Sequence, residues 1–200
     1  MIEYLDTCVG RVLQTVNETN LAENTLIVFL SDQGASSRND FKRDLTEGGL
    51  KVVCNSVWPG QIPAGARVQT AWVHYDLYTT FAAFAGAKIP EDRIVDGKDV
   101  QSLFRGENPE NKRTIYWTYS NEDAIRIENW KLHIIKGKVK GLYDLDKDPD
   151  EKNDLSAKHQ SRVREMQKQI EKWKAECKAG QTSMARSGKT YPIKNHNNNY

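Results

Sequence analysis

Residues 25–32, TLIVFLSD, constrain the possible fold more than any other stretch of the chain. The run is continuously apolar, rich in β-branched residues, and leads directly into Gln-Gly. Its length and flanks predict a buried strand of a mostly parallel sheet. Residues 2–17 carry apolar side chains at three- and four-residue steps, which predicts a helix before this strand. A helix followed by a buried strand is typical of the α/β class.

The end of this strand offers candidate metal ligands. An aspartate just past a buried parallel strand lies at the carboxyl edge of the sheet, where open α/β folds bind ligands. Asp32 and Gln33 supply a carboxylate and an amide oxygen, which suit calcium or magnesium better than zinc or copper. The same residues are also compatible with a simple tight turn after a strand.

Residues 33–50 predict a long loop rich in glycine and charge. Lys42 in this loop is a flexible cation that can contact an anion beside the metal. Because Arg38 and Arg43 flank it, a solvated basic loop is the alternative interpretation. The segment Glu47-Gly48-Gly49 is interpreted as backbone geometry, since paired glycines allow a sharp turn close to a ligand.

The remaining pattern indicates two domains and a tail. A strand is expected at residues 50–57, a helix at 75–86, and a connector with one short helical turn at 89–112. From residue 113 short aromatic and β-branched runs predict an antiparallel meander with strands at 114–119, 123–127, 130–135 and 141–145. A helix follows, with one apolar face formed by Leu155, Val163, Met166, Ile170 and Trp173. The expected domains are residues 1–112 and 113–178, with a tail at 179–200 that has no apolar period.

Composition excludes several classes of function. The net charge is +2, and no dense basic patch with interleaved aromatics indicates nucleic-acid binding. No apolar stretch approaches the roughly 18–20 residues that span a bilayer. Cys8, Cys54 and Cys177 form no C-x-x-C pair, so isolated thiols are expected rather than a zinc site or a disulfide. The four histidines fall in separate elements and are expected to be structural or exposed.

Seven motifs in a fixed order carry a family resemblance. They are IEYLDTCVGRVL, NTLIVFLSDQG, KRDLTEGGLKV, WPGQIPAGARV, VHYDLYTTFAAFAGAKIP, IRIENWKL and LYDLDKDPDEKNDL. Over about residues 1–175 they closely resemble the C-terminal part of a sulfatase of the alkaline-phosphatase-like superfamily. The resemblance implies the C-terminal portion of an alkaline-phosphatase-like α/β sandwich, followed by a small subdomain with a four-stranded antiparallel sheet packed by a helix.

The resemblance also implies an activity and a site. The activity is hydrolysis of sulfate esters of a glycan or an aryl alcohol, with calcium as the expected metal and magnesium as the less favoured one. Asp32 matches a calcium ligand and Gln33 the adjacent ligand position, where asparagine is commoner in the family. Lys42 matches the catalytic lysine that contacts the substrate sulfate. The C-terminal subdomain borders the pocket in such enzymes, which makes Arg126 a substrate-binding candidate together with Tyr119, Asn121 and Glu122.

One part of the family pattern is missing. Family enzymes use a formylglycine nucleophile made from Cys or Ser in C/S-x-P/A-x-R, and none of the three cysteines has that context. We therefore expect Met1 to be an internal methionine at a truncated start, the formylglycine to lie upstream, and the chain alone to be inactive. The resemblance implies an extracytoplasmic location for the full-length protein. Two alternatives stay open: a phosphate or phosphonate ester hydrolase on the same scaffold, and a non-catalytic module that binds anionic glycans.

Overall fold

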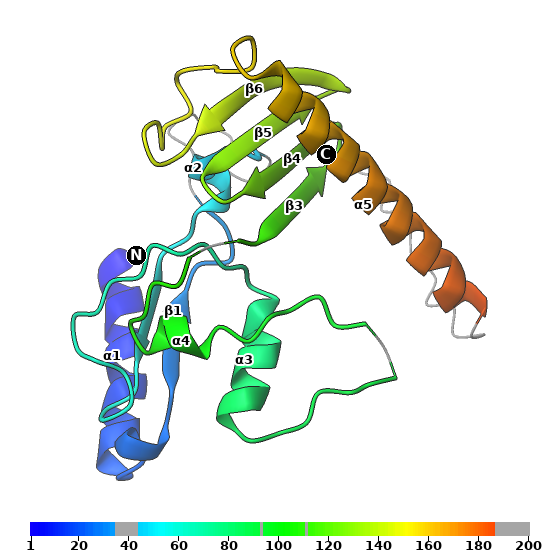
Figure 1. Ribbon diagram of the computed structural model, residues 1–200. Helices are drawn as coiled ribbons and strands as arrows, with labels where there is room; N and C mark the ends of the chain where they lie inside the picture. The colour runs from blue at the N-terminus through cyan, green and yellow to red at the C-terminus, as the bar shows by residue number, and fades with distance from the viewer. Residues whose placement is uncertain (35–43, 93, 111, 187–200) are drawn as a thin grey trace. The chain divides into compact units, whose positions relative to one another are not determined.

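The computed structural model describes residues 1–34, 44–92, 94–110 and 112–186 (Figure 1). The chain forms two compact units, which are residues 1–35 with 51–112 and residues 36–50 with 113–200. One division between the units falls between residues 112 and 113. The assignment of residues 1–112 and 113–178 to two domains stays a prediction. Among the described residues the second unit also takes in residues 44–50, which the sequence pattern places with the first domain.

The first unit contains short elements and a two-stranded sheet. In chain order these are α1 (Ile2–Glu18), the 3₁₀ turn η1 (Ala22–Asn24), β1 (Ile27–Leu30), β2 (Cys54–Val57), α3 (Asp76–Phe84) and α4 (Gln101–Phe104). Three predictions are confirmed, namely the two helices at residues 2–17 and 75–86 and the short helical turn within 89–112.

The expectation of a buried strand with parallel neighbours is wrong for β1. Its partner among the described residues is β2, which runs antiparallel to it. None of the four residues of β1 is buried, and Phe29 is 41% exposed. A continuous apolar run shows that both faces of a strand are suited to burial. The strand is buried only where other elements cover both faces of its sheet. In the described part of this unit the apolar face of α1 is exposed as well, with Ile2 at 84% and Leu5 at 52%.

A buried aspartate organises the start of α3. Asp76 is fully buried, and its carboxylate accepts hydrogen bonds from the backbone N–H groups of Val73 and Lys98, each at 2.9 Å. Gly97 lies so close to the Tyr75 carbonyl that a Cβ atom at this position would collide with it. Asp76 therefore ties residues 97–98 to the first turn of α3, and its role in the V-H-x-D motif is structural in this unit.

The second unit is built on a four-stranded antiparallel sheet. The strands are β3 (Thr114–Tyr119), β4 (Glu122–Ile127), β5 (Trp130–Ile135) and β6 (Lys138–Asp144), paired in chain order. The predicted meander is confirmed, although β6 begins at Lys138 rather than at residue 141. A short helix, α2 (Glu47–Leu50), occupies a segment where the sequence predicts a loop and the start of a strand. The expected strand at 50–57 is therefore wrong at its first residues.

The long helix α5 (Gln160–Arg186) crosses one face of this sheet (Figure 1). The shared core is formed by Ile125, Leu132, Ile134 and Leu142 from the sheet and by Val163, Met166 and Ile170 from the helix. Trp173 stacks on Tyr116, with ring centroids 5.0 Å apart and planes at 6°. The predicted apolar helix face is confirmed at Val163, Met166, Ile170 and Trp173, but Leu155 lies before the start of α5. The helix continues to Arg186, within the segment expected to be a tail.

Candidate functional site

The turn that follows β1 presents the first two predicted ligands. The Ser31 hydroxyl donates a 2.7 Å hydrogen bond to the Gln33 carbonyl, and the Ser31 N–H donates to the Val53 carbonyl at 3.1 Å. His74 Nε2 lies 3.0 Å from the Ser31 carbonyl oxygen. These contacts fix the backbone of the turn from both neighbouring segments. The side chain of Asp32 is exposed, and no partner among the described residues engages its carboxylate.

The chemistry of this turn fits part of a calcium site. A carboxylate and a side-chain amide are hard oxygen donors, which calcium prefers, and calcium takes six to eight of them. Within the described ranges no group of three or more His, Cys, Asp or Glu residues gathers that could hold a metal ion. Asp32 and Gln33 thus supply at most two donors, and the assignment of both residues to a metal stays a prediction.

Lys42, the predicted sulfate contact, lies outside the described residues. Its catalytic and substrate-binding roles therefore also stay predictions. The described chain resumes at Asp44, whose Oδ1 accepts a 2.9 Å hydrogen bond from the Thr46 N–H. Gly49 follows closely, and a Cβ atom there would collide with the Asp44 carbonyl. The interpretation of the paired glycines as backbone geometry is confirmed at Gly49.

Glu47, however, is more than part of a glycine turn. Its carboxylate lies 3.0 Å from the ammonium nitrogen of Lys131, whose side chain is completely buried. The Glu151 carboxylate lies at the same distance from the other side, and its second oxygen accepts a 2.7 Å hydrogen bond from the Glu47 backbone N–H. Arg126 completes the group, with Nη1 3.7 Å from Glu47. Two cations and two carboxylates therefore form one internal network, which we call the Lys131 network.

This network joins three motifs that are far apart in the sequence. Glu47 comes from TEGGL, Arg126 and Lys131 from RIENWK, and Glu151 from DPDEKN. Glu151 has φ = 55°, an unusual backbone conformation for a residue with a side chain. The Asp148 carboxylate holds this turn by accepting hydrogen bonds from the N–H groups of Lys152 and Asn153 at 3.0 and 2.8 Å. Three of the motifs thus contribute side chains to one ion network.

Sequence patterning missed the Lys131 network, although one signal for it was present. In WKLHII the residue Lys131 carries a full charge in a strand otherwise made of apolar residues, a tryptophan and a histidine. A cation at such a position requires acidic partners, because burying an unpaired charge is costly. Nothing in the spacing identifies Glu47 or Glu151 as those partners.

Three of the predicted substrate contacts, Tyr119, Glu122 and Arg126, lie on the sheet face that is turned away from α5. Tyr119 is paired with Glu122 across β3 and β4, and Arg126 lies two strand repeats further along β4. Arg126 is mostly enclosed, with 18% of its side chain exposed, and its Nε donates a 2.8 Å hydrogen bond to the Glu128 carbonyl. Its charge faces Glu47, so contact of Arg126 with a substrate stays a prediction. Tyr119 and Asn121 are exposed at the end of the sheet.

A buried histidine lies on the same face. His133 is 1% exposed, and its Nε2 lies 2.8 Å from the Glu122 carboxylate, while no described group bonds to its Nδ1. Burial lowers the pKa of His133, with nearby Lys140 and Lys131 acting in the same direction and the Glu122 hydrogen bond opposing them. The interpretation of this histidine as structural agrees with its enclosure.

The cysteines show no sign of a nucleophile in the described chain. Cys8, Cys54 and Cys177 are free thiols, and burial raises the pKa of Cys54. A raised pKa reduces the thiolate fraction that nucleophilic attack requires.

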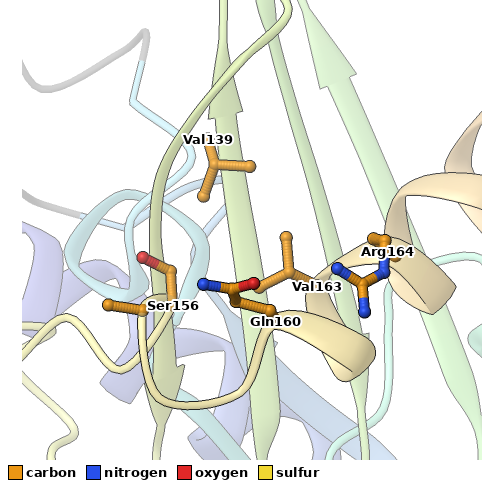
Figure 2. Close-up of a pocket in the computed structure, with 6 residues that line it drawn as sticks. Val139, Ser156, Gln160, Val163 and Arg164 are labelled. Atoms are coloured by element: carbon orange, nitrogen blue, oxygen red, sulfur yellow. The ribbon is translucent and has the colours of Figure 1, made fainter.

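An open hollow of about 330 Å³ occurs elsewhere in the second unit, beside the start of α5 (Figure 2). It is lined by Val139, Ser156, Ala157, Gln160, Val163 and Arg164. Because none of the predicted site residues lines it, it is separate from the residues that the motifs single out.

Comparison with known proteins agrees with the family resemblance that the motifs carry. A family model described as "N-sulphoglucosamine sulphohydrolase, C-terminal" matches residues 39–176. The chain belongs to this sulfatase family. Human steryl-sulfatase is 34% identical over 143 residues, which cover 62% of this chain and 24% of that protein. A sulfatase of Formosa agariphila is 32% identical over 145 residues, which cover 62% of this chain and 26% of that protein.

Solved structures support the same fold. The crystal structure of Ps i-CgsB superposes with a TM-score of 0.76 at 33% identity, covering 86% of this chain and 41% of that chain. A phosphonate monoester hydrolase of Agrobacterium radiobacter superposes with a TM-score of 0.62 at 23% identity, which shows a common fold alone. The chain spans about a quarter of the length of the two curated relatives. Its described helices include none long and apolar enough to cross a lipid bilayer.

Proposed function

We propose that the protein hydrolyses sulfate esters of a glycan or an aryl alcohol. The family match over residues 39–176 is the observation that carries this proposal. The same span contains the Lys42, Glu47, Lys131 and Glu151 motifs in family order. Relatives at 32–34% identity are named as sulfatases, which favours sulfate over phosphonate as the ester that is cleaved.

In the proposed reaction the residues of this chain contribute electrostatic stabilisation. Sulfate-ester cleavage builds negative charge on the sulfate oxygens and on the leaving oxygen, so cations near these atoms lower the barrier. In this proposal Lys42 contacts the sulfate, and Asp32 with Gln33 supplies two oxygen ligands to a calcium ion. Bound calcium would polarise the sulfate oxygens as a Lewis acid. The nucleophile, a formylglycine in this proposal, is not supplied by the cysteines described above.

A sulfated glycan is the substrate class that we favour. A structure of Ps i-CgsB, 33% identical to this chain, contains k-i-k-neocarrahexaose. Another neighbour, at 22% identity, contains D-glucosamine-2-N,6-O-disulfate and supports the fold alone. We place the protein outside the cytoplasm, as the family resemblance implies.

Sulfate release by the protein expressed from its complete coding sequence tests the proposal. Aryl sulfates and sulfated oligosaccharides would be offered with calcium and, separately, with a chelator. We expect turnover that requires calcium and falls at least 100-fold in Lys42→Ala, since loss of a group that stabilises developing charge costs about this much. Absence of sulfate release from every substrate, with formylglycine confirmed by mass spectrometry, would refute it.

A matched pair of variants separates the metal from the sulfate contact. Asp32→Asn should weaken calcium binding measured by calorimetry, because it removes a charged ligand. Lys42→Ala should leave calcium binding intact. Equal calcium affinity in wild type and Asp32→Asn would remove Asp32 from the proposed site.

A further inference from the structure

Three exposed lysines gather at the β5–β6 turn. They are Lys136, Lys138 and Lys140, and all lie within five residues of the sequence KGKVK. We call them the basic hairpin. Elsewhere in this unit lysines such as Lys147 and Lys174 pair with carboxylates at 2.7 and 2.8 Å. No ion pair involves the basic hairpin in the part of the chain that the structure describes.

The nearest acidic residues on β4 are engaged by other partners. Glu122 is held by His133 at 2.8 Å, and Asp123 accepts the ammonium group of Lys174 at 2.8 Å. Each of these carboxylates therefore already has a partner outside the basic hairpin. The hairpin keeps an excess of positive charge at the surface, which attracts anions.

The strand pairing places Lys138 on one sheet face, and an irregularity follows at Lys140. The pairing of β5 with β6 passes from His133 opposite Gly141 to Ile134 opposite Val139, so Lys140 is an extra residue in β6. Val139 packs against the core under α5. Since paired residues share a face, Lys138, opposite Ile135, projects from the sheet face that is turned away from α5. Lys140 is the inserted residue and adjoins the Gly141–His133 pair of that same face. Such bulges commonly redirect side chains near functional sites.

Two polar groups of the neighbouring turn extend this surface. The Asn121 carbonyl accepts a 2.7 Å hydrogen bond from the Lys136 N–H, so the β3–β4 and β5–β6 turns lie side by side. Tyr119, at the end of β3, is 44% exposed. Tyrosine offers a flat apolar ring and a hydroxyl group, a combination that can contact both the face and the hydroxyls of a sugar.

From these contacts we propose that the basic hairpin and Tyr119 bind the saccharide chain of a sulfated glycan, at sugars other than the one whose ester is cleaved. The inference rests on the proposed function for its ligand class. Charge complementarity selects an anionic partner, and the exposed aromatic ring beside the lysines favours a sugar. The surface has only three lysines and one aromatic side chain, which is too small a basic patch to indicate nucleic acid.

Binding of neocarrahexaose to the complete protein tests this surface without requiring turnover. We expect the triple variant Lys136→Gln, Lys138→Gln, Lys140→Gln to raise the dissociation constant about 10-fold at low salt, because each exposed charge contact contributes a factor of about 1.4 to 5. The wild-type affinity should fall as salt is raised, since exposed charges are screened. A desulfated hexasaccharide should bind weakly to both proteins.

The matched control removes the same number of charges from another exposed part of the unit. The variant Lys158→Gln, Lys168→Gln, Lys172→Gln should bind neocarrahexaose as wild type does. Tyr119→Leu should weaken binding of both the sulfated and the desulfated hexasaccharide, because it removes the contact with the sugar ring. Equal losses in the two triple variants would overturn the proposal, as would affinity that does not depend on salt. Binding of an acidic peptide or of DNA as tight as that of the saccharide, lost in the hairpin variant, would overturn the saccharide assignment.

Kinetics distinguish failure of this surface from failure of the proposed function. If the protein is a sulfatase, the hairpin variant should lower its preference for neocarrahexaose over an aryl sulfate about 10-fold, through KM. An unchanged preference would overturn the surface and leave the sulfatase proposal intact. If no ester is cleaved but the hairpin variant still loses salt-dependent binding, the surface stands and the proposed reaction fails.

Discussion

Lys131 shows at the scale of one residue how this fold uses charge. Its ammonium group has no exposed area and is held between Glu47 and Glu151, each at 3.0 Å. A buried ion pair is not in itself strong evidence of net stability, because both charges lose their hydration. Removing one partner is different, since the remaining charges stay buried without compensation. The network therefore joins residues 47–50 to the sheet, and removal of any one of its charged side chains should destabilise it.

Lys131→Met should consequently lower the free energy of unfolding by about 3 kcal/mol, through two carboxylates left without their cation. Urea unfolding followed by tryptophan fluorescence would measure it. The control Lys174→Met breaks the ion pair with Asp123, in which the lysine is 49% exposed, and should cost less than about 1 kcal/mol. A similar small loss for both variants would mean that the Lys131 network is not energetically coupled.

His133 makes stability depend on pH. Burial lowers its pKa from the ordinary value of 6.5. The unfolded chain therefore binds more protons than the folded chain below pH 6.5, so stability should fall as pH decreases from 6.5 toward the lower folded-state pKa. Thermal unfolding between pH 7.5 and pH 5 would measure this slope. His133→Gln removes the titrating group, and the slope in this interval should become shallower; an unchanged slope would assign it to other groups.

At the scale of elements, a strand or helix could be predicted from the sequence when its own residues carry the full periodic pattern of apolar side chains. The strands at 114–119 and 130–135 and the apolar face of α5 were predicted because their side chains alternate or recur with the correct period. β6 was predicted to begin three residues late, because Lys138 and Lys140 are not typical strand residues. These two lysines are in the strand because β5 pairs with them. The first residue of β6 is thus set by pairing with β5 and not by the residue types of β6 itself.

The contact between α5 and the sheet leads to a quantitative prediction. Met166 is 1% exposed and belongs to the core that also contains Ile125 and Leu132. Met166→Ala should lower the free energy of unfolding by about 2–5 kcal/mol, since it leaves a cavity that the surrounding side chains fill only in part. The neighbouring exposed residue provides the control, and Lys168→Ala should change stability by less than about 0.5 kcal/mol. Comparable urea midpoints for the two variants would show that α5 does not stabilise the sheet.

At the scale of the whole molecule, the candidate site was only partly predictable. Asp32 and Gln33 were singled out because they end an apolar run, and they lie at the end of β1 as expected. The partnership of Glu47 with Lys131 was missed, since 84 residues separate them in the sequence and no local period connects them. The parallel arrangement of β1 was wrong because its partner is set by long-range pairing with Cys54–Val57. Local patterns identify which residues need partners, whereas the partners themselves depend on the tertiary fold.

The two compact units should accordingly differ in local stability. In the second unit Ile125 and Leu132 have no exposed area, and the Lys131 network links that sheet to α2. In the first unit no residue of β1 is buried among the described contacts. Opening of a segment is easiest where few apolar contacts must be broken. Hydrogen exchange of the 200-residue chain, measured by mass spectrometry, should therefore show slow exchange in β4 and β5 and exchange at least 10-fold faster in β1 and β2.

Lys131→Met should speed exchange at residues 47–50 without raising that of β1. Uniform exchange across both sheets would show instead that the chain unfolds as one cooperative body, in which the packing of the second unit also protects the strand that precedes Asp32.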